Sequence, residues 1–189
     1  MNLPNKLSIL RILLIPVMVA VFYLPMIPYN YVISAGIFAI SAFTDFLDGY
    51  IARKYNLVTD LGKFLDPIAD KVLVSTALIV MLVVSPNGQA ILPEYGAIAV
   101  AIILARELIV SGFRMVAASK GAVIAADWSG KIKTFVTDIA IVVLLVGADF
   151  SNLYGVINTV GLVLLGISTL LTIVSGTECI VKNRQVLKG

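Results

Sequence analysis

Six long apolar stretches account for most of this 189-residue chain, of which 60% is hydrophobic and only 13% is charged. A soluble domain of this size carries about twice that charged fraction. A stretch of roughly 20 apolar residues crosses the roughly 30 Å hydrocarbon core of a bilayer as one helix. The sequence therefore predicts an all-α integral membrane protein with six transmembrane helices and little room for an extramembrane domain.

Short breaking segments separate the apolar stretches, as at Pro25 and Pro28 or in the turn Pro86-Asn87-Gly88. We expect a single six-helix membrane domain over residues 1–189. Its predicted spans cover residues 8–27, 31–53, 61–84, 95–117, 131–149 and 154–178.

The 14 lysines and arginines lie near the two chain ends and around the second-to-third and fourth-to-fifth connections. The other connections, residues 25–30, 85–94 and 149–153, have none. Positive residues of membrane proteins concentrate in the cytoplasmic loops. Both termini and the two basic connections are therefore predicted to be cytoplasmic, which agrees with an even number of spans.

Four aspartates interrupt the second and third spans near their cytoplasmic ends. A carboxylate near hydrocarbon costs several kcal/mol unless it is neutralised. Asp45 and Asp48 share one helix face by their spacing, as do Asp66 and Asp70. The short connection makes the two spans antiparallel neighbours, so all four carboxylates can face one shallow cleft. Oxygen donors of this kind suit magnesium, calcium or manganese, and four of them could hold two divalent ions.

Small and basic residues accompany these aspartates. Gly49 and Ala52 allow close approach either of another helix or of a flat ligand, and the sequence leaves both readings open. Arg53 could bind a phosphate or anchor the helix at the cytoplasmic surface. Gly62 lies one turn before Asp66 on the same predicted face.

The fourth and fifth spans supply further cations. Arg106 and Arg114, eight positions apart, lie near one helix face. Arginine inside a span is costly and usually functional, and pairing of Arg106 with Glu107 is the structural alternative. Lys131 and Lys133 open the fifth span, either as a phosphate pocket or as cytoplasmic anchors.

The chain contains no histidine, so no imidazole can act as base or metal ligand. Proton chemistry near neutral pH must fall to carboxylates, lysines or bound water. Asp138, inside the fifth span, is expected to pair with one of the nearby cations. Cys179 is the only cysteine, which excludes an intrachain disulfide and favours a buried apolar role.

The acidic segment resembles a known motif. The pattern Asp45-x2-Asp48-Gly49-x2-Ala52-Arg53-x8-Gly62-x3-Asp66-x3-Asp70 resembles, at every fixed position, that of the CDP-alcohol phosphotransferase family. Three further segments are similar to the bacterial branch that makes phosphatidylglycerophosphate. They are Pro4-Asn5-x2-Ser8-x2-Arg11, Arg106-Glu107 through Arg114, and Gly130-Lys131-x-Lys133-Thr134. The chain departs from that branch at Ser8, where threonine is expected, and at Thr137, where glutamine is expected.

The resemblance implies that CDP-diacylglycerol and glycerol 3-phosphate react to give phosphatidylglycerophosphate and CMP. It also implies a plasma-membrane homodimer with the active site facing the cytoplasm, and two Mg²⁺ or Mn²⁺ ions. The implied metal ligands are Asp45, Asp48, Asp66 and Asp70, of which Asp70 is also the implied base. A metal-bound carboxylate is a weak base, so Asp70 either binds the metal loosely or acts through water.

The remaining implied site residues form two groups. Those bordering the nucleotide are Asn5, Ser8, Gly49, Ala52, Arg53 and Gly62. Those binding the acceptor phosphate are Arg106, Arg114, Lys131, Lys133 and Thr134.

Three alternatives are weighed against this function. Another family member would use inositol phosphate, serine or a second lipid as acceptor, as the phosphatidylinositol-phosphate, phosphatidylserine and cardiolipin synthase types do. A membrane prenyltransferase would usually need more than six spans. A divalent-cation transporter would place its acids near the middle of the bilayer with a path to both sides, whereas these acids cluster on one side.

Overall fold

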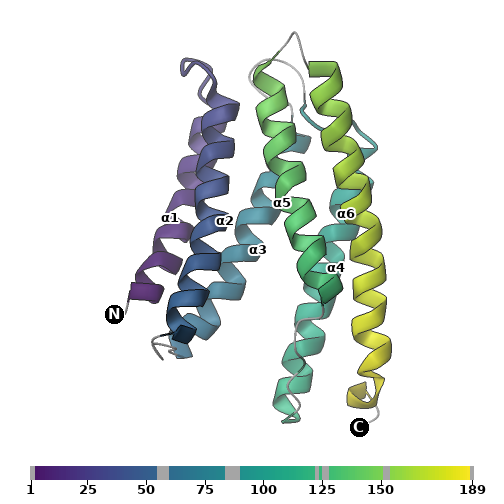
Figure 1. The fold of residues 1–189 in the computed structure, drawn as a ribbon. Coiled ribbons are helices and arrows are strands. Elements are labelled where there is room, and N and C mark those ends of the chain that lie inside the picture. The colour runs from purple at the N-terminus through teal and green to yellow at the C-terminus, as the bar shows by residue number, and fades with distance from the viewer. Residues whose placement is uncertain are drawn as a thin grey trace.

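The computed structural model describes residues 3–54, 60–83, 90–121, 124, 128–150 and 154–187. Within these ranges it leaves out the side chains of residues 3–5, 46–53, 60, 61, 63, 64, 154, 186 and 187. The described residues form six α-helices and a short 3₁₀ helix and contain no strand, so the all-α prediction is confirmed (Figure 1). The elements are α1 (Leu3–Phe22), α2 (Asn30–Lys54), α3 (Asp60–Leu82), α4 (Gly96–Ser119), α5 (Trp128–Asp149), α6 (Tyr154–Lys182) and η1 (Arg184–Leu187).

The helices match the six predicted stretches, with the largest shift in the first. Helix α1 begins at Leu3 and ends at Phe22, whereas the prediction placed this span at residues 8–27. Pro4 is tolerated in the first turn because the N–H groups there have no intrahelical partner. At the other end, Pro25 disfavours helical backbone at Leu24, so the apolar run continues after the helix has stopped.

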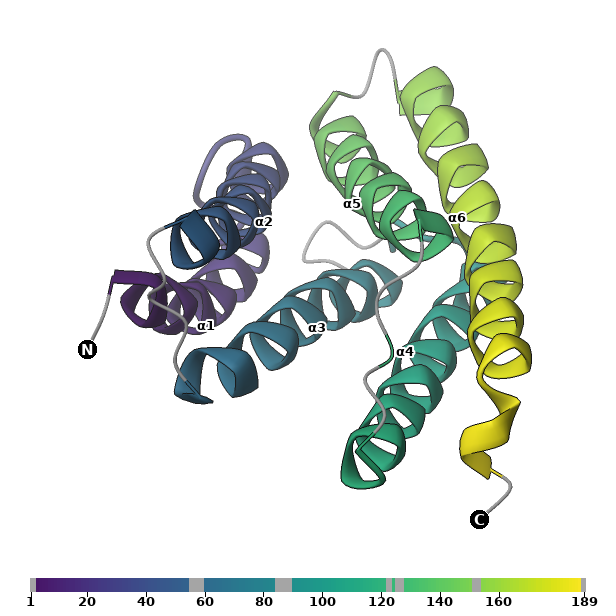
Figure 2. The same cartoon turned by 60° about the horizontal axis from the view of Figure 1, so that its bottom comes forward.

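Helix α1 packs along both α2 and α3, and these two contact each other less than either contacts α1. Helix α5 packs along α2 and α6, and α4 packs on α6 (Figure 2). The predicted neighbours α2 and α3 are in contact, and α1 is the principal packing partner of both. Helix α1 therefore also lies against the two helices that carry the acidic segment, which the sequence did not predict.

The start of α1 and the end of α6 lie at the same end of the bundle, together with the end of α2 and the start of α3 (Figure 1). At the opposite end lie the turn between α1 and α2, the end of α5 and the start of α6. This alternation is the one that the distribution of basic residues predicted. The side that faces the cytoplasm stays a prediction.

The bundle buries a few charged and polar groups beside its apolar core, and it exposes many large apolar side chains. Arg11 is fully buried, and Lys133 is only 3% exposed. Leu108, Phe135 and Leu170 are 66–72% exposed, and they belong to a surface of many exposed large apolar side chains. A soluble monomer rarely exposes such a surface. Among the described residues, α4 and the Gly155–Lys182 part of α6 are long and apolar enough to cross a membrane.

A carboxylate from α5 fixes the first turn of α2. Oδ2 of Asp149 accepts a hydrogen bond from the backbone N–H of Val32 at 2.7 Å. The first N–H groups of a helix lack intrahelical partners and attract negative charge. Nearby, Nδ2 of Asn30 donates to the carbonyl of Phe22 at 2.7 Å. These contacts tie α1, α2 and α5 together at the end away from the termini.

Glycines let α5 and α6 approach closely. A Cβ at Gly161 would lie 2.6 Å from Cγ of Leu144, and one at Gly147 would lie 2.7 Å from Cγ2 of Ile157. Contacts this short force a neighbour to move, so the glycines set the spacing between the two helices. Small residues at helix interfaces serve the same purpose in membrane proteins generally.

We predict that Gly161→Ala lowers the stability of the bundle while Gly166→Ala, on the same helix, does not. A Cβ at Gly166 meets nothing within 4 Å, so the substitution should gain about 0.5–1 kcal/mol from helix propensity. At Gly161 the clash should outweigh that gain and cost about 1–3 kcal/mol. Thermal unfolding of both variants in detergent measures the difference, and equal midpoints would contradict the observed packing.

Candidate active site

An arginine from α1 holds the first aspartate of the acidic segment. Nη1 of Arg11 lies 2.6 Å from Oδ1 of Asp45, and Nε donates to the carbonyl of Ser41 at 3.1 Å. The Arg11 side chain is fully buried, whereas that of Asp45 is 38% exposed. A buried guanidinium requires such partners because an unpaired buried charge is strongly destabilising. Asp45 therefore has a fixed orientation and still presents carboxylate surface.

The same helix holds a second aspartate. Oγ of Ser8 donates to Oδ1 of Asp66 at 2.5 Å, and Ser8 is fully buried. Ser8 and Arg11 are three positions apart and so share one face of α1. One face of α1 thus bonds to Asp45 on α2 and to Asp66 on α3.

Asp70 lies in a pocket enclosed by α3, α4 and α5. From α3 the pocket takes Asp70 with Lys71 and Ser75, and from α5 it takes Lys133 and Thr134. The complete lining is Asp70, Lys71, Val74, Ser75, Ile103, Leu104, Glu107, Lys133, Thr134, Thr137 and Asp138. The fold therefore joins the last aspartate of the acidic segment to the lysine–threonine pair that opens α5.

The pocket lining has more negative than positive groups. Its carboxylates are Asp70, Glu107 and Asp138, and its cations are Lys71 and Lys133. Asp45 also lies close enough to Asp70 for the two charges to interact. An anionic ligand could enter such a pocket only with additional positive charge nearby.

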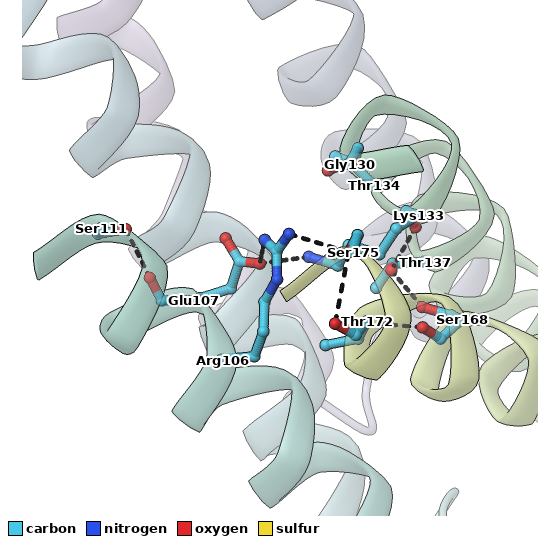
Figure 3. Close-up of polar contacts among 10 residues, drawn as sticks. All are labelled: Arg106, Glu107, Ser111, Gly130, Lys133, Thr134, Thr137, Ser168, Thr172 and Ser175. Atoms are coloured by element: carbon cyan, nitrogen blue, oxygen red, sulfur yellow. Dashed lines mark hydrogen bonds and ion pairs between the residues drawn. The ribbon is translucent and has the colours of Figure 1, made fainter. Parts of the chain in front are cut away.

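A carboxylate on α4 joins two cations. Oε1 of Glu107 lies 2.9 Å from Nη1 of Arg106 and 2.5 Å from Nζ of Lys133 (Figure 3). Nη2 of Arg106 donates to Oγ of Ser175 at 2.9 Å, which brings α6 into the network. The network therefore connects α4, α5 and α6, and Glu107 is the group on which both cations converge.

A glycine on α6 makes room for this network, and a run of hydroxyls extends it. A Cβ at Gly176 would lie 2.9 Å from Cγ of Arg106, so the arginine stem occupies the space that a side chain there would need. Hydroxyl hydrogen bonds continue inward from Ser175 (Figure 3). They link Oγ of Ser175 to the carbonyl of Thr172, Oγ1 of Thr172 to the carbonyl of Ser168, and Oγ1 of Thr137 to Oγ of Ser168.

The residues expected to bind the acceptor phosphate divide into two sets. Lys133 and Thr134 line the pocket, and Arg106 joins them through Glu107. Arg114 and Lys131 do not belong to the lining. Nζ of Lys131 lies 5.3 Å from the ring centroid of the exposed Trp128, a cation–π geometry at the bundle surface.

Several expected site residues lie outside what the structure describes at side-chain level. They are Asn5, Asp48, Gly49, Ala52 and Arg53. Gly62 is described and is buried at the start of α3.

The donors present suit a hard divalent cation. Asp45, Asp66 and Asp70 offer only oxygen, the donor that magnesium and manganese prefer. The excess of negative charge in the pocket calls for added positive charge. Among the described side chains, no three acids or cysteines gather closely enough to hold one ion. Asp48, the fourth expected ligand, is not part of that described set.

Sequence reasoning assigned no site role to four residues that the structure brings to the site. Arg11 ends the N-terminal segment Pro4-Asn5-x2-Ser8-x2-Arg11. Its spacing of three positions from Ser8 was the signal that could have identified it. Lys71 and Ser75 follow Asp70 within about a turn and a half on α3, which is also visible in the sequence. The bridging position of Glu107 depends on how α4 and α5 pack and has no local signal.

The expectation for Asp138 was wrong. Among the described residues it forms no ion pair, and its buried Oδ1 has no hydrogen-bond partner. The physical reason is that Lys133, the nearest cation on α5, is bound to Glu107.

The chain belongs to the CDP-alcohol phosphatidyltransferase family, whose family model matches residues 1–174. The family prediction from the Asp45–Asp70 motif is therefore confirmed. Similar proteins are named CDP-diacylglycerol–glycerol-3-phosphate 3-phosphatidyltransferase. The one from Bacillus subtilis (strain 168) is 38% identical over 99% of this chain and 97% of its own length. The one from Rickettsia bellii (strain RML369-C) is 42% identical over 93% of this chain and 91% of its own length. The one from Salmonella choleraesuis (strain SC-B67) is 40% identical over 76% of each.

We predict that Glu107→Gln destabilises the bundle by about 3 kcal/mol, because it leaves the buried Lys133 without its carboxylate. Adding Lys133→Met to this variant should recover much of the loss. The exposed Glu94 provides the control, since Glu94→Gln should change stability by less than about 0.5 kcal/mol. Unfolding midpoints in detergent test the three variants, and equal midpoints for Glu107→Gln and Glu94→Gln would refute the bridging role.

Proposed function

We propose that this protein transfers the phosphatidyl group of CDP-diacylglycerol to glycerol 3-phosphate, giving phosphatidylglycerophosphate and CMP in phospholipid biosynthesis. The names of the relatives from Bacillus subtilis and Rickettsia bellii, which cover 99% and 93% of the chain, support this reaction. The single observation that supports it best is the pocket shared by Asp70, Lys133 and Thr134. A carboxylate and a phosphate-binding pair in one pocket can orient a phosphorylated alcohol with its hydroxyl toward the carboxylate.

The chemistry follows from that orientation. Lys133 and Thr134, with Arg106 behind them, bind the phosphate of the acceptor. Asp70 accepts the proton of the acceptor's primary hydroxyl, directly or through water. The hydroxyl oxygen then forms a bond to the β-phosphorus of CDP-diacylglycerol. The bond from that phosphorus to the bridging oxygen breaks, and CMP leaves with that oxygen and the electron pair.

In this proposal Asp45, Asp48, Asp66 and Asp70 hold two Mg²⁺ or Mn²⁺ ions. Arg11 and Ser8 support it by orienting Asp45 and Asp66 from α1. When bound, the ions would neutralise the diphosphate and stabilise the CMP leaving group.

The donor nucleotide is proposed to lie at the acidic end of α1, α2 and α3. Its bordering residues would be Asn5, Ser8, Gly49, Ala52, Arg53 and Gly62. We place this end, where α1 begins, α6 ends and basic residues concentrate, at the cytoplasmic face of the plasma membrane. The nucleotide would arrive from the cytosol and the lipid tails from the bilayer. A homodimer, as the family resemblance implies, completes the proposal.

The purified protein should release CMP from CDP-diacylglycerol when glycerol 3-phosphate is present. EDTA should abolish the release, and added Mg²⁺ or Mn²⁺ should restore it, because the carboxylates need the ions to receive the diphosphate. Inositol phosphate, serine and phosphatidylglycerol serve as competing acceptors in separate reactions. Consumption of one of these in place of glycerol 3-phosphate would overturn the proposed acceptor, and full activity in EDTA would overturn the metal site.

Asp70→Asn should lower the rate of CMP release at least about 100-fold, because the amide cannot take the hydroxyl proton. Glu94→Gln, an exposed acid at the opposite end of the bundle, should retain wild-type turnover. Single-turnover rates at saturating substrate separate this loss from weaker binding. Near wild-type release by Asp70→Asn would show that another group is the base.

A further inference from the structure

The pocket contains a carboxylate oxygen with no partner. Oδ1 of Asp138 is buried and accepts no hydrogen bond from any described residue. A buried acceptor without a donor is destabilising, and more so when the group is charged. Such an atom in a binding pocket marks a place where a ligand can supply the missing donor.

The groups around Asp138 do not supply that donor. Lys133, its nearest cation on α5, bonds to Glu107 instead. The hydroxyl of Thr137 is engaged with Ser168 and with the carbonyl of Lys133. The hydroxyl of Thr134 donates to the carbonyl of Gly130 at 3.2 Å. These three donors on α5 are therefore already engaged with other partners.

Asp138 also has a favourable position relative to the proposed acceptor. It lies one helical turn after Thr134, so the two share a face of α5, and both line the pocket with Asp70. An acceptor whose phosphate is bound at Lys133 and Thr134, with one end directed to Asp70, would pass beside Asp138. The ligand group that suits a carboxylate oxygen at that place is a hydroxyl.

We propose that Asp138 is a specificity-determining residue that accepts a hydrogen bond from the second hydroxyl of the acceptor. This inference rests on the proposed function, in which the primary hydroxyl of glycerol 3-phosphate reacts and the middle hydroxyl does not. Asp138 would then select a phosphorylated vicinal diol over an alcohol phosphate that lacks the middle hydroxyl. Sites built to bind a substrate hydroxyl discriminate strongly against analogues without it, because the polar group of the protein is left unpaired.

The test compares two acceptors, glycerol 3-phosphate and 3-hydroxypropyl phosphate, which keeps the phosphate and the primary hydroxyl but lacks the middle one. Their ratio of kcat/KM for CMP release is measured for the wild type, Asp138→Leu and Asp138→Asn. The wild type should favour glycerol 3-phosphate about ten- to hundredfold, as expected for one hydrogen bond to a charged group. Asp138→Leu should lose most of that preference through slower use of glycerol 3-phosphate. Asp138→Asn, which keeps an acceptor oxygen, should fall between the two.

Three outcomes would overturn the inference. The wild type could use both acceptors equally well, a result that needs no variant and so stands even if Asp138→Leu fails to fold. Asp138→Leu could retain the full preference. It could also lose activity with both acceptors by the same factor, which would indicate a structural or electrostatic role. Failure of the proposed function gives a different result, since the wild type would then release no CMP with glycerol 3-phosphate.

Discussion

The contact between Arg11 and Asp45 is the interaction on which the acidic end of the bundle depends. A fully buried guanidinium in a bundle with an apolar exterior must be paired, and its partners lie on α2 at Asp45 and at the carbonyl of Ser41. Ser8, on the same face of α1, extends the arrangement to Asp66 on α3. The first helix is therefore the element that fixes α2 and α3 relative to each other. Helix α1 thus offers a cation to Asp45 and a hydroxyl to Asp66.

The cations of α4 and α5 are also paired with a carboxylate, but here two cations share one. Lys133 and Arg106 meet at the single carboxylate of Glu107, so two cations share one anion across α4 and α5. This leaves a net positive charge in the Arg106–Glu107–Lys133 group. The pocket itself contains both signs of charge, with Asp70 and Lys71 from α3 and Glu107, Lys133 and Asp138 from α4 and α5. A phosphorylated alcohol needs both, since its phosphate needs a cation and its reacting hydroxyl needs a base.

Much of the fold could be predicted from sequence because it depends on local patterns. The six long apolar stretches define the six helices, and prolines and glycines lie near most of the helix ends. The error at α1 arose where apolar residues continue past a helix end that Pro25 determines. The packing of α1 between the acids, and the bridge at Glu107, could not be predicted because they depend on contacts between helices distant in sequence. The motif identified Asp70 and Lys133 separately, whereas their shared pocket is a property of the fold.

The error at Asp138 is the most informative one about the site. The prediction assumed that a buried acid takes the nearest cation, and that rule holds for Glu107. Lys133 forms its ion pair with Glu107 and none with Asp138, and Glu107 also holds a second cation in Arg106. Asp138 is thereby left with an open acceptor inside the pocket. The same competition that stabilises the interface between α4 and α5 therefore creates the unpaired group that a substrate hydroxyl can satisfy.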